Sequence, residues 1–328
     1  MVSSAMEPPS VAGRVQADAR SASSVRSPAH RGSRSRRRPG GRRRGLVGWL
    51  YVLPALAFYT FVVVVPTVQS LSYSLYSWDG VGVPKWVGLK NYTSFATDPV
   101  IISAFQHTIV LVVFFALIPI ALGLVSAALL SRARVRGSGA FRSVIFLPQV
   151  LTTVVIAVIW RQLFSFDGVV NRALDVVGLG QLTQPWLGSF TFALPVLGLA
   201  GTWTTMGLCM LLFLSGVGNI PTELYDAARV DGAGIVREFF AVTLPGLIPQ
   251  ISVALTLTLI AAIRVFDIVW LTTRGGPGTA SITPAVLLYT QAFTAQDIGS
   301  AAAIGVTLAV FSLAVALVIA RVTDRATS

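Results

Sequence analysis

The sequence predicts an all-α membrane protein with six transmembrane helices. The chain has 328 residues, of which 54% are hydrophobic and only 12% are charged. Soluble domains carry about 25% charged residues, so roughly half of the usual charge is absent. Long apolar runs recur along the chain, and each is close to the roughly 20 residues that a helix needs to cross a bilayer.

Residues 1–45 are predicted to form a disordered cytoplasmic tail. This segment contains eleven arginines, is rich in Ser, Pro, Gly and Ala, and has almost no large apolar residue. Such a composition cannot bury enough surface to fold. Its charge is typical of a segment that fixes orientation and contacts anionic lipid. Nucleic-acid binding is the alternative, but no aromatic residues are interleaved with the arginines.

Six apolar segments are the predicted spans, at about 47–71, 105–130, 143–164, 190–216, 247–271 and 300–321. An even number places both termini on one side of the membrane. Arginines are concentrated in the tail and in the loops 131–142 and 217–246, so the positive-inside rule predicts that these segments are cytoplasmic. The C-terminal residues 323–328 then form a second cytoplasmic tail, and 272–299 is outside. Small residues such as Gly198, Gly201 and Gly207 allow close helix approach and predict a packed bundle.

The polar segment 217–246, between the fourth and fifth spans, is predicted to be a helical hairpin. Pro221 and Glu223 are typical of the first turn of a helix. Gly232 permits a left-handed turn, and a second short helix is expected from Ile235 to Thr243, before Pro245.

One face of the first hairpin helix is expected to receive another protein. Leu224, Ala227 and Ala228 have the i, i+3, i+4 spacing of a single helical face, and their small size leaves a shallow surface. An amphipathic linker that lies on the membrane surface is the alternative interpretation.

The hairpin segment resembles the EAA loop of ABC importer permeases, the segment that docks into an ATPase subunit. The matching residues are Asp226, Ala227, Ala228, Asp231, Gly232, Ala233, Leu244 and Pro245. Asp226 stands where the family more often has Glu, which preserves the charge. Two further segments are similar to the carbohydrate-type permeases of this family. They are Trp86–Tyr92 in the first outer loop and, around the end of the fifth span, Phe266, Asp267, Leu271, Thr272, Gly275, Gly276, Pro277, Tyr289, Ala292 and Phe293.

The resemblance extends from about Leu50 to the C-terminus and implies a type I ABC importer permease fold in a bacterial cell membrane. Residues 46–103 would form the first transmembrane helix and outer loop, and 104–322 the ABC transmembrane type-1 domain with 217–246 as its coupling loop. The resemblance implies a permease subunit of the maltose and glycerol-phosphate type. Its implied partners are a second homologous permease, an ATPase dimer, an extracytoplasmic solute-binding protein and membrane lipid, with no nucleic acid. The path would carry a sugar or a sugar-like solute.

Four residues within the spans are candidates for lining that path. Arg264 and Asp267 are the ionisable residues placed most deeply in a span, at i and i+3 on one expected helical face. They form either a polar wall of the path or a structural ion pair. Trp203 and Thr205 offer stacking and hydroxyl contacts to a sugar, although a Trp in a span is more often a packing or interfacial residue.

Enzymatic chemistry has little support in the sequence. His30 and His107 lack metal-ligand spacing, and the single cysteine, Cys209, excludes an internal disulfide. Neither of the two lysines, Lys85 and Lys90, lies in a phosphate-binding loop. We therefore expect no catalytic residue, metal or cofactor, and expect ATP hydrolysis by a separate chain.

Two other classes of protein remain as alternatives. An ion-gradient-driven secondary transporter typically shows an internal repeat and intramembrane carboxylates; the chain has no clear repeat, and Asp267 is its one convincing carboxylate. A membrane-tethered scaffold that holds nucleic acid through its arginine-rich tail is the third hypothesis.

Overall fold

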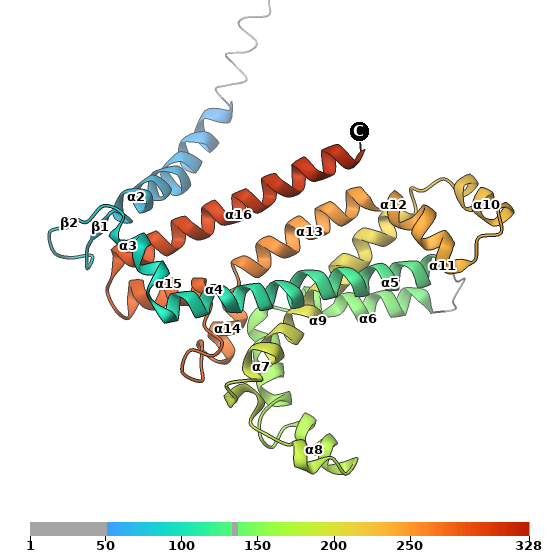
Figure 1. Ribbon diagram of the computed structural model, residues 1–328, viewed down its shortest axis with the longest axis horizontal. Helices are drawn as coiled ribbons and strands as arrows, with labels where there is room; N and C mark the ends of the chain where they lie inside the picture. Colours follow the sequence, from blue (N-terminus) through green and yellow to red (C-terminus); the bar gives the residue numbers. More distant parts are fainter. Residues whose placement is uncertain (1–50, 133–136, 328) are drawn as a thin grey trace, which may run out of the picture. The chain divides into compact units, whose positions relative to one another are not determined.

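The computed structural model describes residues 51–132 and 137–327, which are mostly helical (Figure 1). The predicted tail 1–45, the first residues of the predicted first span and residues 133–136 of the predicted cytoplasmic loop 131–142 lie outside the described residues. The chain divides into two units, residues 1–57 and 58–328. The architecture below is that of the second unit.

Short helical turns alternate with longer helices along the chain. The elements up to residue 132 are a π-helical turn Thr60–Val64, α2 Val65–Tyr73, β1 Tyr76–Ser77, β2 Lys85–Trp86, α3 Lys90–Thr93, a 3-10 turn Ser94–Ala96, α4 Pro99–Val112, a π-helical turn Val113–Leu117 and α5 Ile118–Arg132. The next are α6 Ser138–Val150, α7 Thr153–Leu163, α8 Val169–Val176, 3-10 turns Gly180–Leu182 and Trp186–Gly188, and α9 Ala193–Val217. The last are α10 Thr222–Val230, α11 Ile235–Glu238, a π-helical turn Phe239–Thr243, α12 Leu244–Gly246, α13 Ile248–Ile263, α14 Asp267–Thr272, α15 Pro284–Phe293 and α16 Ile298–Thr327.

The described residues contain four unbroken helical segments that are long and apolar enough to cross a membrane. They are Tyr51–Tyr73, Pro99–Ser131, Ala193–Val217 and Ile298–Thr323. Two bent pairs, Ser138–Val150 with Thr153–Leu163 at 101° and Ile235–Gly246 with Ile248–Ile263 at 70°, raise the number to six if each pair is one span. The predicted six spans agree with this upper number.

Three predicted boundaries differ from the structure. The third span, predicted as one helix over 143–164, is broken between Val150 and Thr153. The fifth, predicted over 247–271, ends its main helix at Ile263 and resumes as α14. The last helix, predicted over 300–321, runs from Ile298 to Thr327 and so includes residues 323–327 of the predicted C-terminal tail.

Helix α9 lies at the centre of the second unit. It packs against α5, α6 and α13, and 56% of its apolar window is buried, the largest share among the four unbroken segments. Its glycines permit these contacts. A Cβ added to Gly201 would lie 2.1 Å from the Phe115 ring, and one on Gly207 would lie 2.6 Å from the backbone oxygen of Ile145. The predicted close packing through small residues is confirmed.

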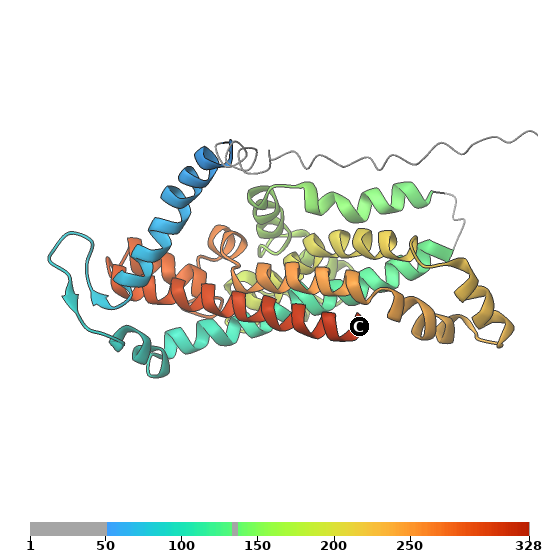
Figure 2. The same ribbon diagram turned by 90° about the horizontal axis from the view of Figure 1, so that it is seen from above.

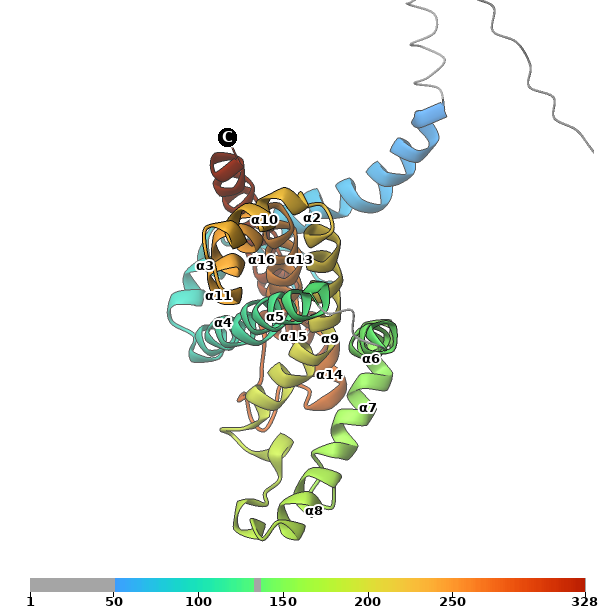
Figure 3. The same cartoon turned by 90° about the vertical axis from the view of Figure 1, so that its right-hand side faces the viewer.

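The helices α10–α12 protrude at the end of the bundle where α9 ends and α13 begins (Figures 1 and 2). Viewed from that side, α10 and α11 lie in front, and α7 runs away from the bundle toward α8 (Figure 3). Both ends of the hairpin therefore join membrane-spanning helices directly.

The other end of the bundle carries the predicted first outer loop and a helix that hydropathy did not reveal. Strands β1 and β2 pair in antiparallel register, Tyr76 opposite Trp86, and the Asn91 side-chain amide donates to the carbonyl of Tyr76 at 2.9 Å. Within the predicted outer segment 272–299, α15 begins at Pro284, and the preceding Thr283 side chain accepts from a backbone amide as an N-cap.

Candidate functional site

The turn of the 217–246 hairpin is a helix terminus closed by glycine. Gly232 has a φ of +73°, as the sequence predicted for a left-handed turn. Its N–H donates to the carbonyl of Arg229 at 3.0 Å, and the N–H of Ala233 donates to the carbonyl of Ala228 at 2.9 Å. These two bonds form a Schellman motif, which satisfies carbonyls at the end of α10 and fixes the exit direction of the chain.

The second arm of the hairpin is longer than expected. The predicted helix from Ile235 to Thr243 forms as α11 and a π-helical turn, but helix continues through Pro245 to Gly246 as α12. Pro245 directly follows the π-helical turn in this continuous helix, so the residue without an N–H lies where the helical hydrogen-bond ladder is already irregular.

An arginine connects the two arms. The Nη1 of Arg229 lies 3.3 Å from Oδ1 of Asp226 on its own helix, and its Nε lies 3.5 Å from Oε2 of Glu238 on α11. The Glu238 side chain is only 5% exposed, and a buried carboxylate requires a partner. Tyr225 adds a second tie, since its hydroxyl lies 3.2 Å from that of Thr243. Sequence reasoning missed Arg229, Glu238 and Tyr225, because ties between two short helices have no periodicity.

The hairpin presents most of the motif residues outward. Asp226, Ala227, Asp231, Gly232 and Pro245 are exposed, whereas Ala228, Ala233 and Leu244 are half-buried. The predicted face is therefore divided, because Leu224 and Ala227 are exposed while Ala228 is partly covered. Large apolar side chains are exposed nearby, at Leu224, Val230, Ile235, Val236 and Phe240. The hairpin therefore exposes apolar side chains beside its motif residues instead of burying them.

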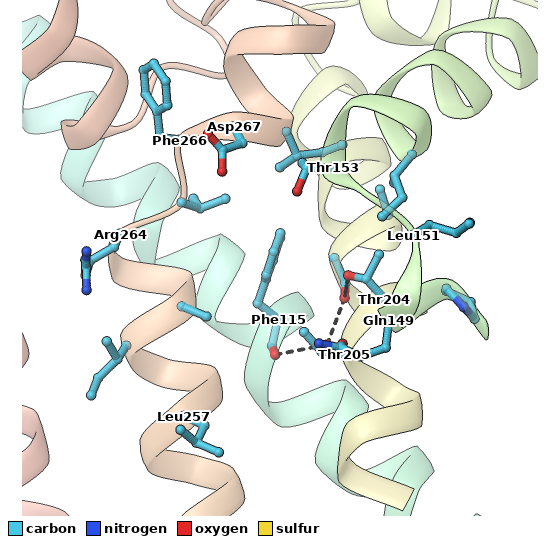
Figure 4. A pocket seen from close by; sticks show the side chains of 18 residues that line it. Phe115, Gln149, Leu151, Thr153, Thr204, Thr205, Leu257, Arg264, Phe266 and Asp267 are labelled. Atoms are coloured by element: carbon cyan, nitrogen blue, oxygen red, sulfur yellow. Dashed lines mark hydrogen bonds between the residues drawn. The ribbon is translucent and has the colours of Figure 1, made fainter. Parts of the chain in front are cut away.

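A second feature is a cavity of about 480 Å³ between two interrupted helices. One wall comes from the α6–α7 break and the other from the α13–α14 break, with α9 and the Val113–Leu117 turn completing it (Figure 4). Polar groups occur in a lining that is otherwise apolar. They are Gln149, Thr153, Thr204, Thr205, Arg264 and Asp267. Interrupted helices supply polar groups at membrane depth only where they are buried in protein or line a water-filled cavity.

Three of the four predicted path residues line this cavity. Thr205, Arg264 and Asp267 belong to it, and the Thr205 hydroxyl donates to the carbonyl of Gly201 at 2.8 Å. A hydroxyl that donates to its own helix still accepts a hydrogen bond from a ligand. Trp203 is not part of the lining. Its ring packs 6.2 Å from that of Trp160, which is a packing contact.

The expected geometry of Arg264 and Asp267 is wrong. Helix α13 ends at Ile263, and Asp267 begins α14, so the two residues do not share one helical face. Their side chains form no ion pair with each other within the described part of the chain. Arg264 extends away from Thr204 and Thr205, whereas the Asp267 carboxylate lies on the cavity side of its backbone (Figure 4). Both residues are exposed in the isolated chain.

The α13–α14 break is held by a buried hydroxyl. Thr283, which is fully buried, donates to the carbonyl of Val265 at 2.9 Å. This bond satisfies a carbonyl that leaves the helical ladder at the break, and an unsatisfied buried carbonyl would cost about 1–3 kcal/mol. The dipeptide Thr283–Pro284 was the available sequence signal, because it marks a helix start.

Comparison with known proteins identifies the family. Residues 119–328 match the family described as binding-protein-dependent transport system inner membrane component. The chain is 35% identical over 275 residues to the probable ABC transporter permease protein YurN of Bacillus subtilis, covering 83% of this chain and 94% of the relative. It is 34% identical over 248 residues to the lactose transport system permease protein LacF of Rhizobium radiobacter, covering 75% and 83%. It is 30% identical over 304 residues to the diacetylchitobiose uptake system permease protein NgcF of Streptomyces coelicolor, covering 89% and 86%.

A solved structure has the same fold. A chain of a bacterial ABC transporter involved in the import of the acidic polysaccharide alginate superposes with a TM-score of 0.76 at 21% identity, over 87% of this chain and 98% of that one. Permeases of this family are transport subunits rather than enzymes, they pair with a second permease, and a separate chain hydrolyses ATP. These findings do not favour a secondary transporter. The chain belongs to the binding-protein-dependent transport system inner membrane components and is a multi-pass permease subunit of an ABC importer in the inner membrane.

Proposed function

We propose that this permease carries a saccharide through the cavity between the two helix breaks. The observation that carries the proposal is the convergence of both broken helices on one cavity of about 480 Å³, lined by hydroxyls, an amide and two charged groups. Ligand sites for small molecules have this size and this mixture of apolar walls with a few polar groups. Relatives named for lactose, diacetylchitobiose and trehalose or maltose transport support a saccharide as the solute.

Two further parts of the proposal concern the partners and the orientation. The 217–246 hairpin is the element that receives the ATPase. It is a polar segment that protrudes from the bundle, and it also exposes several large apolar side chains that a partner could cover. Both termini are cytoplasmic and 272–299 is outside, which follows from the arginine distribution. A second permease closes the open side of the cavity, where Arg264 is exposed. A charged side chain at that depth is costly against lipid.

The path is tested by uptake into vesicles that contain the full complex. Radiolabelled lactose, maltose, trehalose and diacetylchitobiose are supplied singly with the cognate binding protein. Asp267→Asn removes the charge without changing the shape, and Thr205→Val removes the hydroxyl. Each should weaken uptake about tenfold, the value of one lost hydrogen bond to a ligand, while ATP hydrolysis stimulated by the binding protein persists.

Thr258→Val is the matched control for Thr205→Val. The Thr258 hydroxyl also donates to its own helix, at 2.8 Å to the carbonyl of Ala254, but Thr258 is not part of the cavity lining. Wild-type uptake by both Asp267→Asn and Thr205→Val would refute the proposal that this cavity is the transport path. If the wild-type complex takes up none of the four sugars, the proposal that the solute is a saccharide is refuted.

A further inference from the structure

A second cavity, of about 460 Å³, lies beside the far ends of two helices that line the first. Its walls come from the end of α7 and the loop that follows, from the turn Trp186–Gly188 and from the loop after α14. The lining residues that bear on a ligand are Arg161, Phe164, Ser165, Phe166 and Thr272. The turn Trp186–Gly188 precedes the start of α9, whereas the other end of α9 leads to the hairpin. This outer cavity therefore lies on the side away from the hairpin.

The two cavities lie in series along one pair of helices. Helix α7 lines the inner cavity with Thr153 and the outer cavity with Arg161, positions about 12 Å apart along the helix. Helix α14 does the same with Asp267 and Thr272, about 7.5 Å apart along the helix. The two helices pack against each other. A solute that leaves the outer cavity along this pair arrives at the two helix breaks.

The outer cavity has unused hydrogen-bonding capacity. The exposed guanidinium of Arg161 forms no hydrogen bond or ion pair with the other described residues, so its donors are available. The hydroxyl of Ser165 donates to the carbonyl of Gln162 at 3.0 Å, and that of Thr272 donates to the carbonyl of Ile268. Both hydroxyls retain lone pairs that accept hydrogen bonds.

Aromatic side chains give the outer cavity its apolar walls. Phe164 is stacked on Trp160 with ring centroids 5.1 Å apart and an interplanar angle of 8°, which fixes its orientation. Phe166 is 65% exposed. Forked donors, hydroxyl acceptors and flat apolar rings together suit a saccharide, which offers hydroxyls at its edges and C–H groups on its faces.

We propose that this outer cavity is a subsite that holds the saccharide after its release from the binding protein and before it enters the inner cavity. The inference rests on the proposed saccharide path. It assigns to Arg161 the role of a ligand-contacting residue that prevents escape back to the outside. A surface that only docks the binding protein is the competing explanation, and the experiment separates the two.

The test measures the number of sugar molecules imported per ATP hydrolysed. The full complex, in vesicles, receives saturating binding protein loaded with whichever of lactose, maltose, trehalose or diacetylchitobiose the wild type imports. Arg161→Gln should hold the sugar about tenfold more weakly, so more ATP is hydrolysed per sugar imported. The binding-protein concentration that half-saturates ATP hydrolysis should stay unchanged. Arg161→Lys keeps the charge but loses the forked donor geometry. Its ratio of imported sugar to hydrolysed ATP should therefore lie between those of the wild type and Arg161→Gln.

Arg172→Gln provides the matched control. Arg172 is an exposed arginine on α8, outside the outer cavity, and its replacement should leave the ratio of sugar to ATP unchanged. An unchanged ratio in Arg161→Gln would overturn the subsite. A changed half-saturating concentration with an unchanged ratio would show a docking surface instead. A wild-type complex that imports none of these sugars would refute the saccharide path itself, and with it the subsite.

Discussion

Gly232 acts through its backbone and not through its contacts. A Cβ added there would meet no atom within 4 Å, but the residue has a φ of +73°. Gly232→Val therefore introduces strain of about 1–3 kcal/mol without a steric clash. The hairpin should relieve the strain by breaking its Schellman bonds, which redirects α11. We expect the permease to insert normally into the membrane. Either ATPase subunits should be lost from the purified complex, or ATP hydrolysis should no longer drive uptake.

Gly234→Val is the control for this substitution. Gly234 is two residues away and also has open space around its Cβ position, but it lies in the extended region, with φ −72° and ψ 172°. The same side chain is thus added to the same turn without left-handed strain. Equal and full activity of the two variants, with all subunits present, would show that this turn does not position the ATPase contact.

At the level of secondary-structure elements, the ion pair between Arg229 and Glu238 connects α10 to α11. Arg229→Met should loosen the hairpin and leave the buried Glu238 carboxylate with one partner fewer, at a cost of about 1 kcal/mol. Glu238→Gln keeps the size of the side chain and removes its charge. The measured quantities are the ATPase subunits retained per permease and the uptake. If Arg229 and Glu238 act through their mutual interaction, the double variant should lose little more of either than each single variant does.

Arg237→Met serves as the control for Arg229→Met. Arg237 is an exposed arginine on α11 with no ion pair among the described residues. Its removal should have little effect. Fully additive losses in the double variant, or an effect of Arg237→Met as large as that of Arg229→Met, would contradict the tie.

Hydropathy predicted the approximate positions of the apolar segments, and its six spans equal the upper number that the structure allows, but it did not predict the breaks. The segments 143–164 and 247–271 read as continuous apolar runs, and the break at Arg264 contains neither proline nor glycine. Tertiary bonds, such as that from Thr283 to the carbonyl of Val265, stabilise the break, and they join residues 18 positions apart. Gly232 was predictable because one residue type suits its backbone. The placement of Arg264 and Asp267 on one face failed because it assumed an unbroken helix.

At the scale of the whole molecule, one helix links the two candidate sites. Helix α13 follows the hairpin after the fully buried Leu247 and runs for 16 residues, or about 24 Å, to the break that lines the inner cavity. A displacement of the hairpin by a bound ATPase would therefore pass through the 70° bend at Leu247 and then along one continuous helix to the cavity wall. An ATPase in the cytoplasm and a solute that enters from outside would require the hairpin and the outer cavity to lie on opposite sides of the membrane.

The orientation of the chain in the membrane therefore tests whether the hairpin and the outer cavity lie on opposite sides. Single cysteines replace Ser35, in the arginine-rich segment, and Thr279, which is exposed in the segment 272–299. Both are placed in a Cys209→Ala background, where the fully buried native thiol is absent. Because the arginines are retained on the cytoplasmic side, a membrane-impermeant thiol reagent should label Thr279→Cys in intact cells. It should label Ser35→Cys only after the cells are permeabilised, which also shows that both thiols are reactive. Labelling of Ser35→Cys in intact cells would place the hairpin outside, where no ATPase can reach it, and would refute the coupling assigned to it.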